Sequence, residues 1–119
     1  MPDPEPAVEL SAEDTKIVTL ARSVRARTQA AEGACVRDLD GRTYAGASVS
    51  LASLTLSAVD VAVAMAVSSG SRGLEAVAVL TDEGSVSEHD LDVVRDFAGA
   101  GVTVLRGDAR GQVAEVTST

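Results

Sequence analysis

The sequence has 119 residues and a formal net charge of −8 at pH 7, and 45 % of its residues are hydrophobic. This length and composition indicate one folded domain with a hydrophobic core and exclude a disordered chain. The negative charge opposes broad contact with the phosphates of nucleic acids, which requires lysine and arginine, so we expect no nucleic-acid partner.

Two further features bear on where the chain works. No apolar run has the length that crosses a membrane, and no basic and apolar leader opens the sequence, so we expect no membrane partner. The single cysteine, Cys35, cannot form a disulfide within the chain. Together these observations predict a cytoplasmic protein.

The N-terminal segment differs in composition from the rest of the chain. Residues 1–10 are acidic and contain all three prolines, which predicts a disordered tail ahead of a single domain over residues 11–119. Ser11 then opens a helix, because Ser11 and Asp14 have the spacing of a capping box and acidic residues fill the first turn.

A hairpin is predicted after this helix. Ala34–Arg37 and Thr43–Val49 are two strand-like runs, and Asp38–Gly41 joins them. The connection ends in an Asp-Gly pair, which favours the tight turn of a β-hairpin.

The longest apolar stretch, Leu54–Gly70, predicts a central helix whose first turn is Ser57–Asp60. Val61, Val63 and Met65 alternate as they would in a strand, but the run is too long, too rich in alanine and ends in a Ser-Ser-Gly stop signal. A helix that is apolar on every side must be covered on every side. We therefore hypothesise that its outer face meets the same helix of a neighbouring subunit, in a homodimer or tetramer.

The second half of the chain alternates strands with one helix. Leu74–Thr81 is an apolar strand, Ser87 caps a helix over Glu88–Ala98, Val102–Leu105 is another buried strand, and Gln112–Val116 is an edge strand. The order of these elements predicts a three-layer α/β/α domain with a mixed sheet of about five strands and a buried central helix.

Few residues could supply the chemistry of a site. A zinc ion that activates water takes three ligands from His, Cys, Asp and Glu, and this chain has one histidine, His89, and one cysteine, Cys35. Cys35 lies in an apolar strand without basic neighbours, which indicates a core residue. Ser87, His89 and Asp90 open one helix and point in different directions, so we expect no Ser-His-Asp relay. The same helix start favours a neutral His89.

Five acidic residues lie near this helix start: Asp82, Glu83, Glu88, Asp90 and Asp92. Their oxygen atoms could hold a hard cation. The simpler interpretation is that these carboxylates complement a turn and the positive end of a helix.

Several strings resemble those of the cytidine deaminases: Gly33–Cys35, Asp40–Gly46, Ala66–Gly70 and Val93–Phe97. The resemblance runs from residue 11 to about residue 108 and lies in positions of the scaffold. In the cytidine deaminases, a central helix opens with Cys-Ala-Glu or His-Ala-Glu, and a following helix opens with Pro-Cys-x-x-Cys. In that family zinc is held by these cysteines or the histidine, and the glutamate transfers protons while water attacks C4 of the base.

This sequence departs from the family at the positions that carry the reaction. Ser57 falls where the first zinc ligand would be, and Val59 falls where the catalytic glutamate would be. Ser87 and Asp90 fall where the paired cysteines would be. A serine hydroxyl is a poor zinc ligand and a valine transfers no proton, so we predict that zinc-dependent deamination is lost and that no zinc cofactor is bound.

The binding positions depart as well, since Ser48 and Ser50 stand at the Asn-x-Glu that grips the ribose. We therefore predict a non-catalytic binding or assembly protein whose degenerate pocket could take a nucleoside-like molecule. Its residues would be Ser48, Ser50, Ser57, Val59, Ser87 and Asp90. The alternative is a zinc-dependent cytidine or nucleoside deaminase with an atypical site, of which Ser57, Ser87 and Asp90 would be the remnants.

Overall fold

The computed structural model describes residues 8–119. Its elements in chain order are α1 (Ala12–Thr28), β1 (Gly33–Asp38), β2 (Thr43–Ala47), β3 (Val49–Leu51), β4 (Leu54–Leu56), α2 (Ala58–Ser68), β5 (Leu74–Leu80), α3 (Glu88–Ala98), β6 (Thr103–Gly107) and β7 (Val113–Ser118). Residues 1–7 of the expected tail lie outside the described residues. Of the remaining tail residues, Leu10 packs against the core beneath α1.

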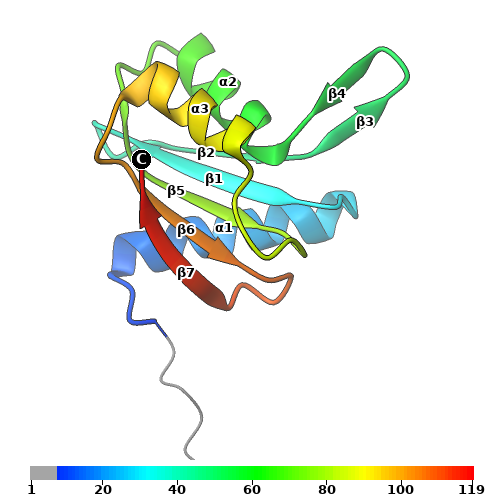
Figure 1. Ribbon diagram of the computed structural model, residues 1–119, viewed down its shortest axis with the longest axis horizontal. Helices are drawn as coiled ribbons and strands as arrows, with labels where there is room; N and C mark the ends of the chain where they lie inside the picture. The colour runs from blue at the N-terminus through cyan, green and yellow to red at the C-terminus, as the bar shows by residue number, and fades with distance from the viewer. Residues whose placement is uncertain (1–7) are drawn as a thin grey trace, which may run out of the picture.

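A mixed sheet of five strands forms the middle one of three layers, with helices on both of its faces (Figure 1). Its strand order is β2-β1-β5-β6-β7, in which β5 and β6 run parallel and the other neighbours run antiparallel. Helix α1 covers one face, and α2 and α3 cover the other. The predicted three-layer α/β/α fold is confirmed.

Each face of the sheet has its own core because successive side chains of a strand point to opposite faces. In β5, Val77 and Val79 pack toward α2 and α3, while Ala76, Ala78 and Leu80 pack toward α1. All five side chains are buried. The continuous apolar run of this strand therefore follows from its place in the middle of the sheet.

The predicted hairpin is formed by β1 and β2, with Val36 opposite Tyr44. Asp38 closes its turn from inside: one carboxylate oxygen accepts the backbone N–H groups of Asp40 and Arg42, both at 2.9 Å. The other oxygen accepts the hydroxyl of Ser71 at 2.5 Å. This buried carboxylate thus joins the hairpin to the loop between α2 and β5.

The central helix is shorter than predicted, because Leu54–Leu56 is the strand β4 and not the first part of the helix. Ser57 sets the start of α2 through a capping box: its hydroxyl accepts the N–H of Asp60, and the Asp60 carboxylate accepts the N–H of Ser57, both at 3.0 Å. The three residues before this cap pair with β3 in a two-stranded ribbon that projects from the body (Figure 1).

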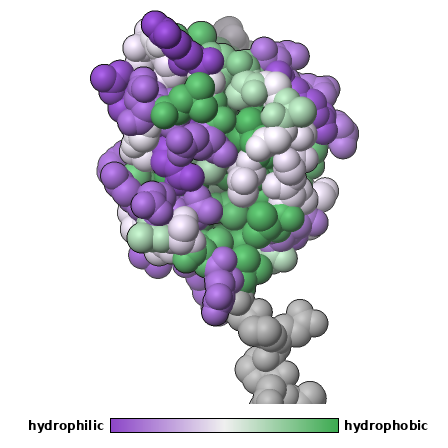
Figure 2. Space-filling view, turned by 90° about the vertical axis from the view of Figure 1, so that its left-hand side faces the viewer, coloured by the Kyte–Doolittle hydropathy of each residue, from purple (hydrophilic) through white to green (hydrophobic). Residues whose placement is uncertain are grey.

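One side of α2 is not covered by the chain itself. Met65 is 41 % exposed and Val67 is 50 % exposed, and on the ribbon Leu51 is 63 % exposed. On the face of the molecule drawn in Figure 2, apolar surface lies in separate patches divided by hydrophilic side chains. Among residues 8–119, no helix is both long and apolar enough to cross a membrane.

Candidate functional site

The first turns of α2 and α3 meet above one face of the sheet (Figure 1). Each helix begins with a serine that caps it. The hydroxyl of Ser57 accepts the N–H of Asp60 at 3.0 Å, and the hydroxyl of Ser87 accepts the N–H of Asp90 at 3.1 Å. The two caps fix where both helices start, and therefore bring their first-turn side chains together.

A hydrogen bond joins the two helix starts. The Ser57 hydroxyl donates to a carboxylate oxygen of Asp90 at 2.6 Å, and Asp90 is only 4 % exposed. The Ser57 oxygen thus accepts one hydrogen bond as a cap and donates another to the neighbouring helix. Because Asp90 sits in the first turn of α3, its negative charge also lies at the positive end of that helix.

A second contact between the helices lies nearer the solvent. The Nε2 atom of His89 is 2.8 Å from a carboxylate oxygen of Asp60. This hydrogen bond, together with the charge of Asp60, raises the pKa of His89, and Asp90 and Asp92 add to the shift. This direction is opposite to the one expected from the helix start, since the carboxylate across the gap favours the charged ring.

The contact with His89 also shifts the pKa of Asp60. Burial alone would raise the pKa of Asp60, but the N–H of Ser57 and the ring of His89 outweigh it and lower that pKa. Asp60 was not singled out in the sequence, although its capping spacing from Ser57 was visible. The only signal in the sequence is the repeated Ser-x-x-Asp spacing of Ser57–Asp60 and Ser87–Asp90, and the structure shows in addition that these two helix starts lie side by side.

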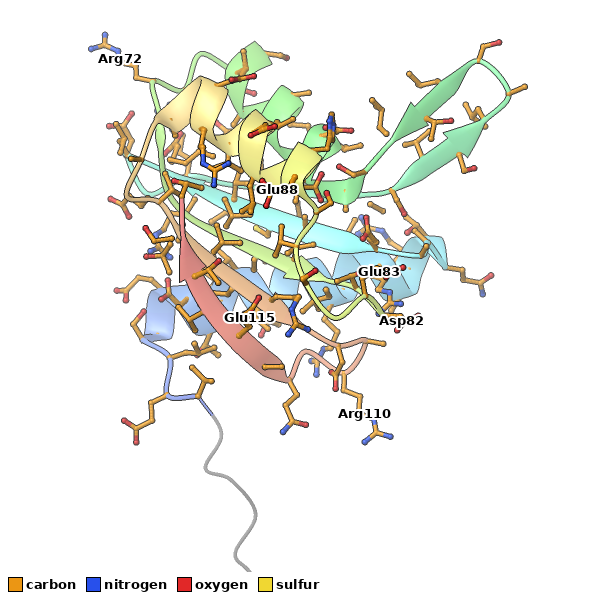
Figure 3. The ribbon with its side chains drawn as sticks, viewed as in Figure 1. Arg72, Asp82, Glu83, Glu88, Arg110 and Glu115 are labelled. Carbon is orange, nitrogen blue, oxygen red and sulfur yellow. The ribbon has the colours of Figure 1, made fainter. Side chains whose placement is uncertain are left out.

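A groove of about 470 Å³ opens beside the start of α2. Five of its lining residues carry a hydroxyl group: Ser48, Ser50, Thr55, Ser57 and Thr81. Three others carry a carboxylate, Glu32, Asp82 and Glu83, and the rest of the lining is Ala31, Val49 and Leu56. Figure 3 shows Asp82 and Glu83 on the loop after β5, at the same end of the molecule as Arg110.

The structure places the six residues expected in the pocket in three different surroundings. Ser48, Ser50 and Ser57 line the groove. Val59 is 1 % exposed and packs in the core between α2 and the sheet. The other two, Ser87 and Asp90, lie at the start of α3 and are not part of the groove lining.

The donors at the family's zinc position do not fit that ion. Ser57, Ser87 and Asp90 offer two neutral hydroxyls and one carboxylate, whereas zinc is bound by thiolates, imidazoles and carboxylates. Both hydroxyls already accept a hydrogen bond from a backbone N–H, and the Ser57 hydroxyl also donates one to Asp90. The polar groups of Ser57, Ser87 and Asp90 thus form hydrogen bonds with one another and with the backbone.

A different set of donors could hold a metal. Within residues 8–119, Asp60, His89 and Asp90 are the one group of three that offers ligand atoms within 4.8 Å of one another. Imidazole and carboxylate suit zinc and other divalent ions. An ion there would have to compete with the His89–Asp60 and Ser57–Asp90 hydrogen bonds. The acidic residues singled out in the sequence contribute only Asp90 to this group.

Cys35 supplies no nucleophile. It is fully buried beneath α1, and burial raises the pKa of its thiol to about 11. The thiol therefore stays protonated at neutral pH, in agreement with the predicted core role.

Comparisons with known proteins agree on the fold. A model of the family described as cytidine deaminase-like matches residues 10–111. The structure of cytidine deaminase from Burkholderia pseudomallei is similar with a TM-score of 0.77 at 21 % identity, over 92 % of this chain and 93 % of that one. The structure of cytidine deaminase from Mycobacterium leprae has a TM-score of 0.71 at 18 % identity, over 91 % and 94 % of the two chains.

A third structure, cytidine deaminase from Mycobacterium tuberculosis, has a TM-score of 0.67 at 24 % identity, over 79 % of this chain and 85 % of that one. No curated protein matches the sequence. At these identities the likeness to solved structures concerns the fold, and the activity has to be argued from the site.

Proposed function

The chain belongs to the cytidine deaminase-like family, and we propose that it is a member that does not carry out zinc-dependent deamination and acts by binding or assembly. The observation that carries this proposal is Val59. The residue stands where the resemblance places the proton-transferring glutamate, and its buried methyl groups cannot accept or give a proton. The hydroxyls of Ser57 and Ser87, at the positions of zinc ligands, support the same conclusion because they are used as helix caps.

The test is a direct assay with zinc supplied. Purified protein is incubated with equimolar zinc and millimolar cytidine, and the conversion to uridine is followed by absorbance, with an active cytidine deaminase as the positive control. We expect no turnover. Turnover together with about one zinc ion per chain would contradict the proposal.

The groove beside α2 is the proposed binding site. Its volume of about 470 Å³ lies within the range of small-molecule sites, and its hydroxyls and carboxylates can accept hydrogen bonds from the hydroxyl and amino groups of a nucleoside-like molecule. A ligand that binds only the folded chain raises its melting temperature, so a thermal-shift titration with cytidine, uridine and adenosine tests this site.

A matched pair of substitutions locates the effect. Ser50→Trp places a large ring in the groove lining, whereas Ser53→Trp places the same ring in the ribbon turn outside it. We expect the first variant to lose the shift and the second to keep it. A shift that survives Ser50→Trp, or no shift at millimolar nucleoside, would count against binding in this groove.

Assembly is proposed through the open side of α2. The exposed Met65 and Val67 support this interface, because large apolar side chains that α2 leaves in solvent are stabilised when a second copy covers them. The single buried Cys35, which cannot form an internal disulfide, is consistent with the proposed cytoplasmic location.

A second candidate function is supported by Asp60, His89 and Asp90. It is a metal-dependent nucleoside deaminase with an atypical site, in which these residues would hold an ion that supplies Lewis-acid chemistry. Metal analysis separates the two candidates. Stoichiometric zinc that disappears in His89→Ala would favour the second, and a metal content that His89→Ala leaves unchanged near zero would favour the first.

A further inference from the structure

The starts of α2 and α3 lie in contact above the core on one face of the sheet. In the family that this chain resembles, zinc is held between the corresponding two helix starts. Here the donors at those positions do not fit zinc, yet the two starts still touch. Contacts between side chains of the two helices therefore join the starts at this position.

We propose that the Ser57–Asp90 hydrogen bond, with the two serine caps around it, joins the starts of α2 and α3 at the position where the family holds zinc. The inference goes beyond the proposed function, because it concerns what replaces the ion and not what the groove binds. It rests on the 2.6 Å contact and on the burial of Asp90.

The chemistry of this contact suits a structural role. A hydroxyl that donates to a carboxylate forms one of the stronger hydrogen bonds in proteins, and 2.6 Å is the distance typical of that class. A buried carboxylate without a partner would be strongly unfavourable, so the bond and Asp90 stabilise the fold only together. The Ser57 oxygen accepts the N–H of Asp60 at the same time, which fixes the direction of its proton.

The serine caps position the two residues of this hydrogen bond, Ser57 and Asp90. Ser87 accepts the N–H of Asp90 at 3.1 Å, so the cap of α3 sets the backbone from which the Asp90 carboxylate reaches Ser57. The His89–Asp60 contact is a second link between the helices, but the His89 side chain is 66 % exposed. Water competes with such an exposed link, which leaves Ser57–Asp90 as the better shielded of the two polar links between the helix starts.

The first experiment uses a matched control that the chain offers. Ser57→Ala and Ser87→Ala each remove a helix cap, but only Ser57 also donates to the neighbouring helix. In urea unfolding we expect Ser57→Ala to lower the stability more than Ser87→Ala. A double-mutant cycle with Ser57→Ala and Asp90→Ala should give a coupling of about tenfold in the unfolding equilibrium constant. Coupling within error of one would overturn the inference.

The second experiment returns thiols to the same positions. The variant Ser57→Cys, Ser87→Cys, Asp90→Cys should retain about one zinc ion per chain after desalting and lose stability in a chelator, whereas the natural chain should retain none and keep its melting temperature. A folded triple variant that retains no zinc would show that the hydrogen bond does not occupy the metal position. Zinc retained by the natural chain would overturn the inference as well.

Zinc retained by the natural chain would count against both proposals, and the double-mutant cycle tells them apart. Turnover of cytidine would contradict the proposed function and would not by itself change the measured coupling. An absent coupling in a chain that does not deaminate cytidine would contradict this inference alone. If the triple variant does not fold, the double-mutant cycle still decides the question.

Discussion

At the scale of single residues, Asp38 shows how a charged group becomes part of a core. Its carboxylate is 1 % exposed and accepts hydrogen bonds from the Ser71 hydroxyl and from the backbone of Asp40 and Arg42. The Ser71 hydroxyl makes the largest contribution to lowering the pKa of Asp38, which outweighs the opposing effect of burial. The charged form is therefore the one that the fold stabilises.

We predict that Asp38→Asn lowers the free energy of unfolding by about 1.5–3 kcal/mol, since hydrogen bonds to a buried charge are lost and an amide cannot accept on both atoms. Asp40→Asn, in the same turn but exposed, is the matched control and should change it little. Urea unfolding at neutral pH measures both. Equal losses in the two variants would contradict the prediction, because the buried hydrogen bonds of Asp38 would then add nothing to the free energy of unfolding.

The His89–Asp60 pair predicts a dependence of stability on pH. The folded pKa of His89 is raised above 6.5 and that of Asp60 is lowered below 3.8. A raised histidine pKa stabilises the fold below the unfolded value and loses this effect as pH rises through the folded value. A lowered aspartate pKa stabilises the fold above the unfolded value and loses the effect as pH falls through the folded value.

The pair therefore stabilises the fold mainly between these two pKa ranges. We expect His89→Gln to lower the urea midpoint more at about pH 5.5 than at about pH 9, because only the charged ring is attracted by Asp60. In an Asp60→Asn background the same substitution should have no such pH dependence. A loss that is equal at both pH values would contradict this assignment of the charge.

At the scale of elements, the packing of α2 on the sheet depends on a missing side chain. A Cβ atom at Gly46 in β2 would lie 2.6 Å from Cγ1 of Val61 and 3.1 Å from the backbone nitrogen of Ala62. The helix lies this close to β2 only because position 46 is glycine.

We predict that Gly46→Ala destabilises the chain by about 1–3 kcal/mol through overpacking. Gly84→Ala is the control, because a Cβ atom there meets nothing within 4 Å. Adding Val61→Ala should recover part of the loss, since Val61 supplies the nearest atoms. Thermal unfolding measures the series, and a Gly46→Ala variant as stable as Gly84→Ala would contradict the close approach.

Some helices and strands could be predicted from the sequence and others could not. The helices α1 and α3 were predicted with their caps, Ser11 and Ser87, because a capping residue and an apolar face are both local signals. The ribbon was missed because its two strands of three residues are too short to show alternation, and Leu54–Leu56 runs without a break into an apolar helix. The group Asp60, His89 and Asp90 was missed for another reason: it forms only when two helices separated in sequence bring their first turns together.

At the scale of the whole molecule, α2 leaves one side exposed, where we expect copies of the chain to meet. The sequence predicted an apolar helix covered on every side, and within one chain Met65 and Val67 are left exposed. The apolar pattern thus identified the helix correctly, but a pattern cannot say whether the same chain or a second copy covers it.

We predict that the natural chain is a homo-oligomer and that Met65→Glu with Val67→Glu converts it to a monomer, because carboxylates would be buried without partners in the contact. Leu39→Glu, at another exposed apolar position, is the control and should leave the assembly intact. Light scattering at micromolar concentration gives the mass. A monomeric natural chain would contradict the prediction.

The order of strands has a consequence for a divided chain. In the middle of the sheet β1 pairs with β5, from Gly33 opposite Leu80 to Asp38 opposite Leu74, so the two halves of the sequence share one sheet. Cleavage in the ribbon turn between Ala52 and Ser53 would give two fragments, each of which lacks the strand that completes its core. We expect that neither fragment folds alone and that the two recover the structure only when mixed, which would make the ribbon turn a suitable place to divide the chain for a split reporter.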